Sequence, residues 1–423
     1  MATATRSVSE ICLEARSAAR TLAALDTDSK DAALRAIADA LIQRSYEIVE
    51  ANARDMQAGR ANGLSASLLD RLALDAGRIA AIAAGTRAIA ALPDPIGEVV
   101  EGRRLPNGLD VRMLRVPFGV VAVVYEARPN VTIDAAALCL KSGNAVVLRG
   151  SSSAAHSNAV LAAIASEAAT AAGLPDGAIG LVAGGGREEL AELATQDGVV
   201  DLIFPRGGEG LKAALKAVAT VPVIYAASGN CHVYVDASAD LDDAEAIILN
   251  AKVQKPSVCN AAETLLVHAQ AAPAFLPRVL RALQGAGVEL RVDGRVRALS
   301  GDLAPSLTDA GDEDWDTEFL ALVLAVKVVD SIEEAIEHIN EHGSGHSEAI
   351  VTRDTAAARA FELGVDAACV YVNASTRFTD GGEFGMGAEI GNSTQKLHAR
   401  GPIGVRELCT FKYVVAGDGH VRP

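Results

Sequence analysis

The chain has 423 residues, of which 50% are hydrophobic and only 4% aromatic, and it contains 38 glycines. This length allows two or three domains with a large core, and the composition is typical of an α/β enzyme with many tight turns. The net charge of −16 argues against nucleic-acid binding, which requires clustered Lys and Arg. Its cysteines are widely spaced without a CxxC pair, so they indicate neither a disulfide scaffold nor a zinc ribbon.

The sequence lacks the patterns of exported and membrane-embedded proteins. Residues 1–6 are not followed by an apolar signal core, and no apolar run reaches the length that a bilayer requires. We therefore expect a protein of the reducing cytoplasm with no membrane partner and no nucleic-acid partner.

The first quarter of the chain has the apolar spacing of helices. Apolar residues recur three and four positions apart in residues 8–25, 30–48 and 78–92. Residues 99–115 then alternate around the pair Asn107-Gly108, which predicts a β-hairpin that projects from the core. Because such a ribbon has open edges, we expect it to pair with another subunit.

From residue 117 onward, strand and helix patterns alternate. The expected strands are residues 120–125, 145–148, 179–182, 202–204, 221–226 and 232–235, and the expected helices between them are residues 133–140, 157–172, 188–193 and 211–218. A second series covers residues 320–329, 332–342, 349–352, 356–363 and 370–373. This alternation predicts two α/β lobes, the first a doubly wound parallel sheet, with Cys259 near their junction.

Cys259 lies in a short polar turn between a helical pattern ending near residue 251 and an apolar strand at residues 264–267. Ser257 could cap a short turn of helix, which would place Cys259 near its amino end and near Lys255. Such a setting favours the nucleophilic thiolate, whereas most free cysteines are small buried hydrophobes. We expect Cys259 to be reactive and the other cysteines, which lie in apolar patterns, to be structural.

Two glycine-rich loops follow predicted strands and open helices, at residues 184–186 and 205–210. Backbone N–H groups at such helix starts bind phosphate groups well. Neither loop has the GxGxxG spacing, so a tight turn that happens to contain glycines explains each loop about equally well.

Other clusters carry weaker signals. His338, His342 and His346 are four residues apart, but Gly343 and Gly345 break the helix before the third histidine, so we expect no metal site. The acidic run at residues 309–318 is by default a solvated loop. Its end, at residues 318 and 319, leads into a strand and would aim a carboxylate and a ring at a cleft.

Taken together, six segments resemble the aldehyde dehydrogenase superfamily, and within it the branch of γ-glutamyl phosphate reductases. These segments cover residues 116–121, 125–132, 229–236, 254–260, 315–319 and 383–391, in the order and spacing of that branch. The resemblance implies an aldehyde dehydrogenase-like fold with two α/β lobes and a β-ribbon arm. It implies a cofactor-binding domain at 1–97 and 116–236, a catalytic domain at 237–395, and oligomerisation arms at 98–115 and 396–423.

The resemblance also assigns roles to residues of the site. Cys259 matches the nucleophile, and Asn130 matches the amide that forms an oxyanion hole with the Cys259 backbone N–H. Glu318 resembles the carboxylate that holds the nicotinamide ribose, and Phe319 the neighbouring ring. We further expect Arg128, Lys255 and Arg377 to include the cations that bind the substrate's phosphate or α-carboxylate.

Cofactor contacts are implied for a second group of residues. Arg149 and Ser151 resemble the strand end that meets the adenosine ribose, and a guanidinium there could pair with the 2′-phosphate of NADPH, which the branch prefers. Gly207 and Gly208 match the helix start over the pyrophosphate. We expect NADPH as the cofactor and no metal.

The stretch Ala226-Ala-Ser-Gly-Asn230 departs from ordinary aldehyde dehydrogenases, which carry a hydrolytic glutamate there. An enzyme that exchanges phosphate for thiolate gains by lacking such a base. The resemblance thus implies NADPH-dependent reduction of L-glutamyl 5-phosphate to L-glutamate 5-semialdehyde, a step of proline biosynthesis. A CoA-acylating aldehyde dehydrogenase and a catalytically silent nucleotide-binding protein are the alternatives. A homodimer or homotetramer and a transient glutamate 5-kinase partner are further expectations.

Overall fold

The computed structural model describes residues 6–184, 186–226 and 228–422. The chain forms two compact units. Unit 1 comprises Met1–Ala226, Gly385–Gly391 and Ile403–Pro423, and unit 2 comprises Ala227–Phe384 and Asn392–Pro402. None of the described helices combines the length and the apolar character needed to cross a lipid bilayer.

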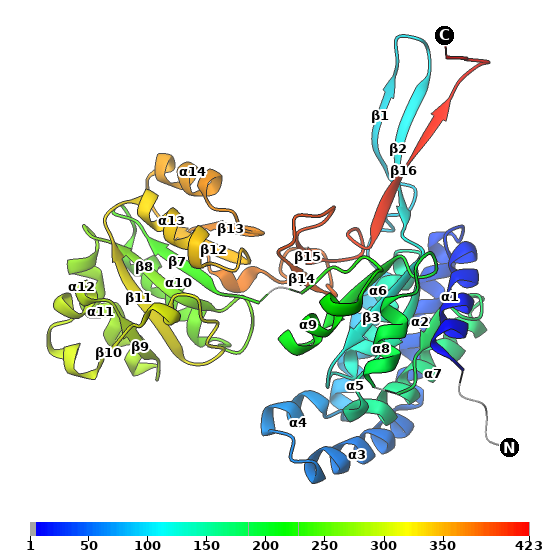
Figure 1. Cartoon of the computed structure of the whole chain (residues 1–423), viewed down its shortest axis with the longest axis horizontal. Coiled ribbons are helices and arrows are strands. Elements are labelled where there is room, and N and C mark those ends of the chain that lie inside the picture. Colours follow the sequence, from blue (N-terminus) through cyan, green and yellow to red (C-terminus); the bar gives the residue numbers. More distant parts are fainter. Residues whose placement is uncertain (1–5, 185, 227, 423) are drawn as a thin grey trace. The chain divides into compact units, whose positions relative to one another are not determined.

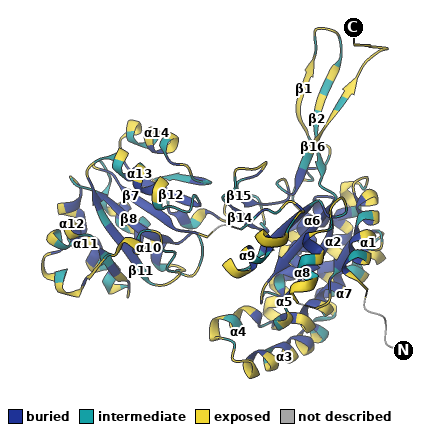
Figure 2. Cartoon of the chain, viewed as in Figure 1, coloured by how far each residue is buried: buried dark blue, intermediate teal, exposed yellow. Residues whose placement is uncertain are grey.

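Unit 1 is built on a parallel sheet in the order β5-β4-β3-β6, of which β3 is labelled in Figure 1. Its central strands β3 (Val120–Tyr125) and β4 (Ala145–Arg149) are buried throughout, as expected of parallel strands covered on both faces. Figure 2 shows the interior of unit 1 largely in the dark blue of buried residues. The outer strands are β5 (Ile179–Leu181) and β6 (Leu202–Arg206). The helices of unit 1 are α1 (Val8–Leu22), α2 (Thr27–Gln43), α3 (Ser45–Ala61), α4 (Ala66–Leu72), α5 (Ala76–Ala90), α6 (Asn130–Lys141), η1 (Ser152–Ala154), α7 (Ala155–Ala171), α8 (Arg187–Ala194) and α9 (Glu209–Val218).

Two expected elements of unit 1 differ from the structure. The helix expected at residues 30–48 is interrupted at Arg44, where φ is −105° and ψ is 21°, so that α2 ends and α3 begins. The strand expected at residues 221–226 is reduced to one bridge between Ile203 and Val223. Pro222 has no N–H to donate, which prevents a regular ladder on this segment.

The predicted ribbon is confirmed and gains a third strand. Strand β1 (Val99–Arg104) pairs antiparallel with β2 (Asp110–Pro117), and Gly108 turns between them with φ of 94°. Strand β16 (Cys409–Ala416) pairs along the other edge of β2, from Cys409 opposite Pro117 to Ala416 opposite Asp110. Parts of the two segments expected as separate arms, 98–115 and 396–423, therefore form one three-stranded sheet, the β-arm (Figure 1). The second arm was expected to start too early, because residues up to Pro402 belong to unit 2.

Unit 2 contains a larger parallel sheet in the order β10-β9-β11-β8-β7-β12-β13 (Figure 1). Its strands are β7 (Cys231–Val235), β8 (Ala262–His268), β9 (Glu289–Val292), β10 (Thr308–Asp309), β11 (Val323–Val329), β12 (Ser347–Val351) and β13 (Cys369–Val372). Its helices are α10 (Leu241–Val253), α11 (Ala272–Gly285), α12 (Gly294–Leu299), η2 (Gly301–Ser306), η3 (Asp312–Asp314), α13 (Ile332–His342), α14 (Thr355–Gly364) and η4 (Thr376–Phe378). The short strands β14 (Gly391–Ser393) and β15 (Gly401–Ile403) pair with each other.

The boundary between the lobes lies earlier than expected. The sequence placed residues 232–235 in the first lobe, whereas β7 is hydrogen-bonded between β8 and β12 of the second sheet. The compact units divide after Ala226, not after Asp236, and the segment Gly385–Gly391 returns to unit 1. The strand pattern alone cannot tell which of two parallel sheets a buried strand joins, because both offer the same environment.

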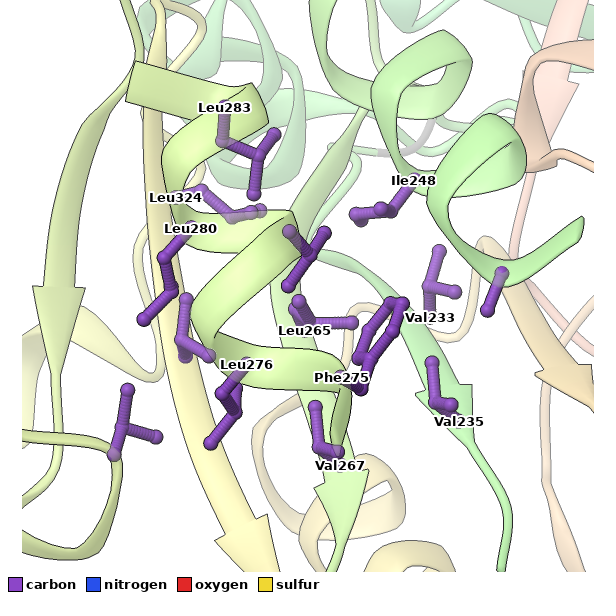
Figure 3. Packing of buried hydrophobic residues seen from close by; sticks show 14 of the residues in the cluster. Val233, Val235, Ile248, Leu265, Val267, Phe275, Leu276, Leu280, Leu283 and Leu324 are labelled. Carbon is purple, nitrogen blue, oxygen red and sulfur yellow. The ribbon is translucent and has the colours of Figure 1, made fainter. Parts of the chain in front are cut away.

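The core of unit 2 forms where α11 packs on the sheet (Figure 3). Phe275, Leu276, Leu280 and Leu283 lie on one side of α11 and are completely buried. They meet strand side chains that include Val233, Val235, Leu265, Val267 and Leu324. Each such side chain contributes about 1.5–3 kcal/mol relative to exposure, which makes the sheet a rigid base for the loops at its edges.

Candidate functional site

Cys259 lies in a turn between α10 and β8 and is half-buried, whereas the other five cysteines are buried. The short helix expected around it is absent. The carbonyl of Cys259 accepts a hydrogen bond from the Cys231 thiol at 3.2 Å, and the Asn260 carbonyl accepts one from Thr376 Oγ1 at 2.7 Å. Because these carbonyls bond to other segments, they do not form a helical ladder.

Burial makes four of the other cysteines weak acids. Desolvation raises the pKa of Cys12 and of Cys409 to about 12, and it raises the pKa of Cys139 and Cys231 strongly. These thiols therefore remain protonated at neutral pH and are poor nucleophiles.

Arg377, in η4, bonds to two residues of the Cys259 turn, and its positive charge acts on Cys259. Its Nε donates to Gln254 Oε1 at 2.9 Å, and its Nη1 donates to Asn260 Oδ1. Burial lowers the pKa of Arg377, and the charges of Asp380 and of the Cys259 thiolate oppose that shift. The same attraction favours the anionic sulfur. Lys255, which the sequence singled out for this role, is exposed in the turn.

Glu318 and Phe319 lie just before β11, in the same unit as Cys259. Glu318 Oε1 accepts the N–H of Gly229 at 2.7 Å. A Cβ atom on Gly229 would lie 1.5 Å from the Cys259 carbonyl oxygen, so only glycine fits between the two segments. The predicted nucleophile and the predicted ribose-binding carboxylate are thus held together through one glycine.

In unit 1, Asn130 begins α6, directly beyond β3. Its Nδ2 donates to Asp134 Oδ2 at 2.9 Å. Burial raises the pKa of Asp134 to about 6, although the Asn130 hydrogen bond and the charge of Arg206 lower it. An amide nitrogen carries two hydrogens, so this contact fixes the orientation of Asn130 and leaves one N–H for another acceptor.

Arg149 is the last residue of β4, and Ser151 lies two residues later. Arg149 is buried, and its Nη2 donates to the carbonyl of Gly186 at 2.7 Å, which joins it to the first glycine loop. Burial lowers the Arg149 pKa, and the charges of two nearby glutamates oppose this shift. Ser151 Oγ accepts the N–H of Ala127 at 3.1 Å.

The second glycine loop leads from β6 into α9. Gly208 donates its N–H to Glu126 Oε2 at 3.0 Å, and a Cβ atom on Gly207 would lie 2.6 Å from the same oxygen. The start of α9 therefore already attracts an anionic group, as helix amino ends do. Arg128 is half-buried next to Ala127, whose φ is +36°.

Comparison with known proteins agrees with this geometry. Residues 1–297 and 307–414 match the aldehyde dehydrogenase family. A γ-glutamyl phosphate reductase of Thermobifida fusca is 56% identical over 417 residues, which cover 99% of each chain. The chain belongs to the aldehyde dehydrogenase family. Within that family it groups with the γ-glutamyl phosphate reductases.

Solved structures of the family support the same placement. The crystal structure of γ-glutamyl phosphate reductase from Thermotoga maritima has a TM-score of 0.96 at 44% identity and covers 99% of this chain and 100% of its own. An acetylating aldehyde dehydrogenase from Geobacillus thermoglucosidasius shares the fold, with a TM-score of 0.68 at 20% identity over 98% of this chain and 97% of its own. Membership of the aldehyde dehydrogenase family makes the chain an oxidoreductase that uses a nicotinamide cofactor and a small-molecule substrate.

For an aldehyde dehydrogenase, the segment before β7 is unusual. Residues 226–230 contain no Asp or Glu, and position 227 lies outside the described residues. Asn230, which the sequence left without a role, donates Nδ2 to the carbonyls of Trp315 at 2.6 Å and His342 at 2.8 Å. Asn230 thus ties the approach to β7 to the Glu318 segment. The Gly229-Asn230 pair inside a matching segment was the available signal.

A buried histidine network was also missed. Glu348 Oε2 accepts a hydrogen bond from the His232 backbone N–H at 2.7 Å and lies 3.0 Å from the His232 ring Nδ1. Burial lowers the His232 pKa to about 3, so the ring is neutral. His338 packs edge-on against His232, with ring centroids 5.6 Å apart. Among the described residues, no three His, Cys, Asp or Glu side chains are grouped to hold a metal ion.

Proposed function

We propose that the chain reduces L-glutamyl 5-phosphate to L-glutamate 5-semialdehyde and phosphate, with NADPH as reductant and a thioester at Cys259. The observation that carries this proposal is the half-buried Cys259 in a turn where the Arg377 guanidinium bonds to Gln254 and Asn260, while every other cysteine is buried. The relatives named γ-glutamyl phosphate reductase, at 56% and 54% identity over nearly the whole chain, support the choice of substrate.

In the first step, the Cys259 thiolate attacks the acyl carbon. A C–S bond forms, the C–O bond to phosphate breaks, and phosphate leaves with the electron pair. When bound, NADPH supplies the hydride that reduces the thioester carbon. The C–S bond then breaks, which frees the aldehyde and returns the Cys259 thiolate. The stretch 226–230, where the resemblance places a hydrolytic glutamate in ordinary aldehyde dehydrogenases, contains no carboxylate, which supports a thioester that is passed to phosphate and not to water.

Asn130 is the proposed amide donor to the oxyanion that forms in both steps, together with the Cys259 backbone N–H. Its contact with Asp134 supports this role because it orients the amide in advance. A preorganised donor of this kind is worth about a hundred- to a thousandfold in rate.

The proposed cofactor contacts divide between two groups of residues. Arg149 and Ser151 would hold the adenosine ribose and its 2′-phosphate, and Gly207 and Gly208 the pyrophosphate. The Nε of Arg149 is buried without a hydrogen-bond partner among the described residues, which suits a guanidinium that awaits a phosphate or ribose oxygen. Glu318 would hold the nicotinamide ribose beside the Phe319 ring.

Positive groups are proposed to receive the anionic ends of the substrate. Arg377 has the strongest support because its charge interacts with the Cys259 sulfur, where the leaving phosphate departs. Lys255 is exposed in the Cys259 turn, and Arg128 lies two residues before Asn130.

The reverse reaction tests the proposal. Semialdehyde and NADP⁺ are mixed with the protein, with inorganic phosphate or with CoA, while the absorbance of the reduced nicotinamide is followed. We expect sustained reduction with phosphate and none with CoA. Turnover that depends on CoA would establish a CoA-acylating dehydrogenase instead, and an inactive protein whose Cys259 is not labelled by iodoacetamide would indicate a silent nucleotide-binding protein.

We also propose that the β-arm joins subunits into a homodimer or homotetramer in the cytoplasm. Its strands expose large apolar side chains, including Val99 at 51%, Tyr413 at 64% and Val415 at 55%. Light scattering on the purified protein tests this, and a monomer would contradict it. A transient glutamate 5-kinase partner is proposed from the lability of the acyl phosphate.

A further inference from the structure

Lys252 and Glu263 form an ion pair whose side chains are both completely buried. Lys252 is in the last turn of α10, and Glu263 is the second residue of β8. The pair therefore brackets the Cys259 turn in the chain, seven residues before the sulfur and four residues after it. Burial lowers the pKa of Lys252 and raises that of Glu263 to about 7, and the mutual contact opposes both shifts.

Stability alone gives no reason for such a pair. Two buried charges lose their hydration, and replacing both partners with apolar residues is often neutral or stabilising. Removing only one partner is strongly destabilising because it leaves an unpaired buried charge. The remaining contacts of the two side chains point to a different role.

The second oxygen of Glu263 contacts the segment that carries Glu318. Glu263 Oε1 accepts the N–H of Leu320 at 3.3 Å. Leu320 has φ of +53°, a conformation that is costly for a residue with a side chain and that persists only where neighbouring contacts hold it. The Nζ of Lys252 lies 6.0 Å from the centroid of the Phe319 ring, within the range of a cation–π contact.

Together with the contacts of Glu318 and Gly229, these contacts link the Glu318 segment to residues on both sides of Cys259 in the chain. On one side, Glu318 accepts the N–H of Gly229, which lies against the Cys259 carbonyl. On the other side, the two residues after Glu318 contact Glu263 and Lys252. The segment that carries Glu318 is thus held by Gly229, which precedes Cys259 in the chain, and by Glu263, which follows it. All of these residues belong to unit 2.

We propose that Lys252 and Glu263 are positioning residues that fix Leu320, and through it the Glu318 carboxylate and Phe319 ring, beside the Cys259 turn. Glu263 supplies the acceptor for Leu320, and Lys252 keeps that carboxylate in place. This inference rests on the proposed function, because it assigns the consequence to binding of the nicotinamide end of the cofactor.

Two matched double variants test the proposal. Lys252→Met with Glu263→Gln removes both charges but keeps a carbonyl oxygen for the Leu320 N–H. Lys252→Met with Glu263→Leu removes both charges and the acceptor. Neither leaves a lone buried charge, so both are expected to fold, and thermal denaturation together with the iodoacetamide labelling rate of Cys259 checks this.

The readouts are the dissociation constant of NADPH, from fluorescence titration, and the KM values for cofactor and acyl phosphate. In the leucine double variant we expect the NADPH dissociation constant and KM to rise about tenfold to a hundredfold, while the KM for acyl phosphate changes little. In the glutamine double variant, both constants should stay within about threefold of those of the unchanged protein.

Equal NADPH binding in both double variants, whether normal or equally weakened, would overturn the proposal, since the Leu320 contact would then be irrelevant. Measurements on the unchanged protein separate this failure from failure of the proposed function. If the unchanged protein catalyses the phosphate-dependent reverse reaction while the variants behave alike, only the positioning role is wrong. If the unchanged protein binds no NADPH, the proposed function itself is wrong.

Discussion

The candidate residues of the two units occupy opposite edges of their parallel sheets. In unit 1 they lie where strands end: Asn130 follows β3, Arg149 ends β4 and Gly207 follows β6. In unit 2 three of them lie where strands begin, since Gly229 precedes β7, Cys259 precedes β8 and Glu318 precedes β11, whereas Arg377 is the exception and follows β13. In each sheet the three strands concerned are neighbours, in the orders β4-β3-β6 and β11-β8-β7.

This difference changes the electrostatics available to each site. Loops at the carboxyl edge lead into helix amino ends, whose N–H groups and partial positive charge attract anions. A loop at the amino edge arrives from a helix carboxyl end, whose partial charge is negative, as α10 does before Cys259. Helix geometry therefore does not favour a thiolate there, and the positive charge comes from side chains such as Arg377.

The largest expected effect comes from removing the Cys259 sulfur, at the edge of the unit 2 sheet where strands begin. Cys259→Ala should lower turnover by more than about a thousandfold, because every other cysteine is buried, while NADPH binding should be unchanged. Steady-state rates and fluorescence titration measure the two effects. Cys139→Ala, at a buried thiol of unit 1, is the control and should stay near the original rate.

Removal of one amide tests the carboxyl edge. Asn130→Ala should lower the turnover number by about a hundred- to a thousandfold with a small change in NADPH affinity, since one oxyanion donor is lost. Asn130→Asp is the matched control, because it preserves the size of the side chain but replaces the donor by a carboxylate, and it should be equally impaired. Near-normal turnover of the alanine variant would remove Asn130 from the site.

Close packing at Gly229 should matter more than flexibility at Gly208. A methyl group on Gly229 would collide with the Cys259 carbonyl, whereas a Cβ atom on Gly208 meets nothing within 4 Å. Gly229→Ala is expected to cost about 1–3 kcal/mol of stability and to slow iodoacetamide labelling of Cys259. Gly208→Ala should change neither the stability nor the labelling rate, which thermal denaturation and iodoacetamide labelling measure. An equal loss of stability in both variants would contradict the packing argument.

Acid should weaken unit 2 before unit 1. Burial lowers the pKa of His346 to about 4, below its ordinary value of 6.5, so the unfolded chain binds more protons between these values. Neutral His346 therefore contributes to the free energy of unfolding in full above pH 6.5. This contribution, up to about 3 kcal/mol, is lost as the pH falls towards 4. In unit 1, His156 and His420 are exposed. Hydrogen exchange at pH 7 and pH 5 should show the larger loss of protection in unit 2, and His346→Gln should reduce it.

The smallest expected effect concerns Glu126, whose carboxylate accepts the N–H of Gly208 just before α9. Glu126→Gln should tighten NADPH binding by about two- to fivefold, because a negative group is removed from the place proposed for the pyrophosphate. Glu188→Gln, at another exposed glutamate of unit 1, is the control for loss of charge. Weaker binding in the Glu126 variant would place the pyrophosphate elsewhere.

The sequence predicted much of this arrangement for definite physical reasons. Apolar runs such as residues 120–125 are unambiguous buried strands, and the pair Asn107-Gly108 determines its hairpin. The local setting of Cys259 suggested a reactive cysteine, and the resemblance of short motifs assigned roles to Glu318 and Asn130 that stay predictions. The membership of β7 and the buried partners Lys252, Glu263 and Glu348 depend on contacts between distant segments, which no local pattern reveals.

The Cys259 thioester is tested most directly by a burst experiment in the oxidative direction. Semialdehyde and NADP⁺ are mixed rapidly with the protein in the absence of phosphate, and the first phase of NADPH formation is measured. The account predicts one NADPH per Cys259 followed by near arrest, with turnover restored by added phosphate and no burst in Cys259→Ala. Sustained turnover without phosphate, or a burst that survives in Cys259→Ala, would contradict it.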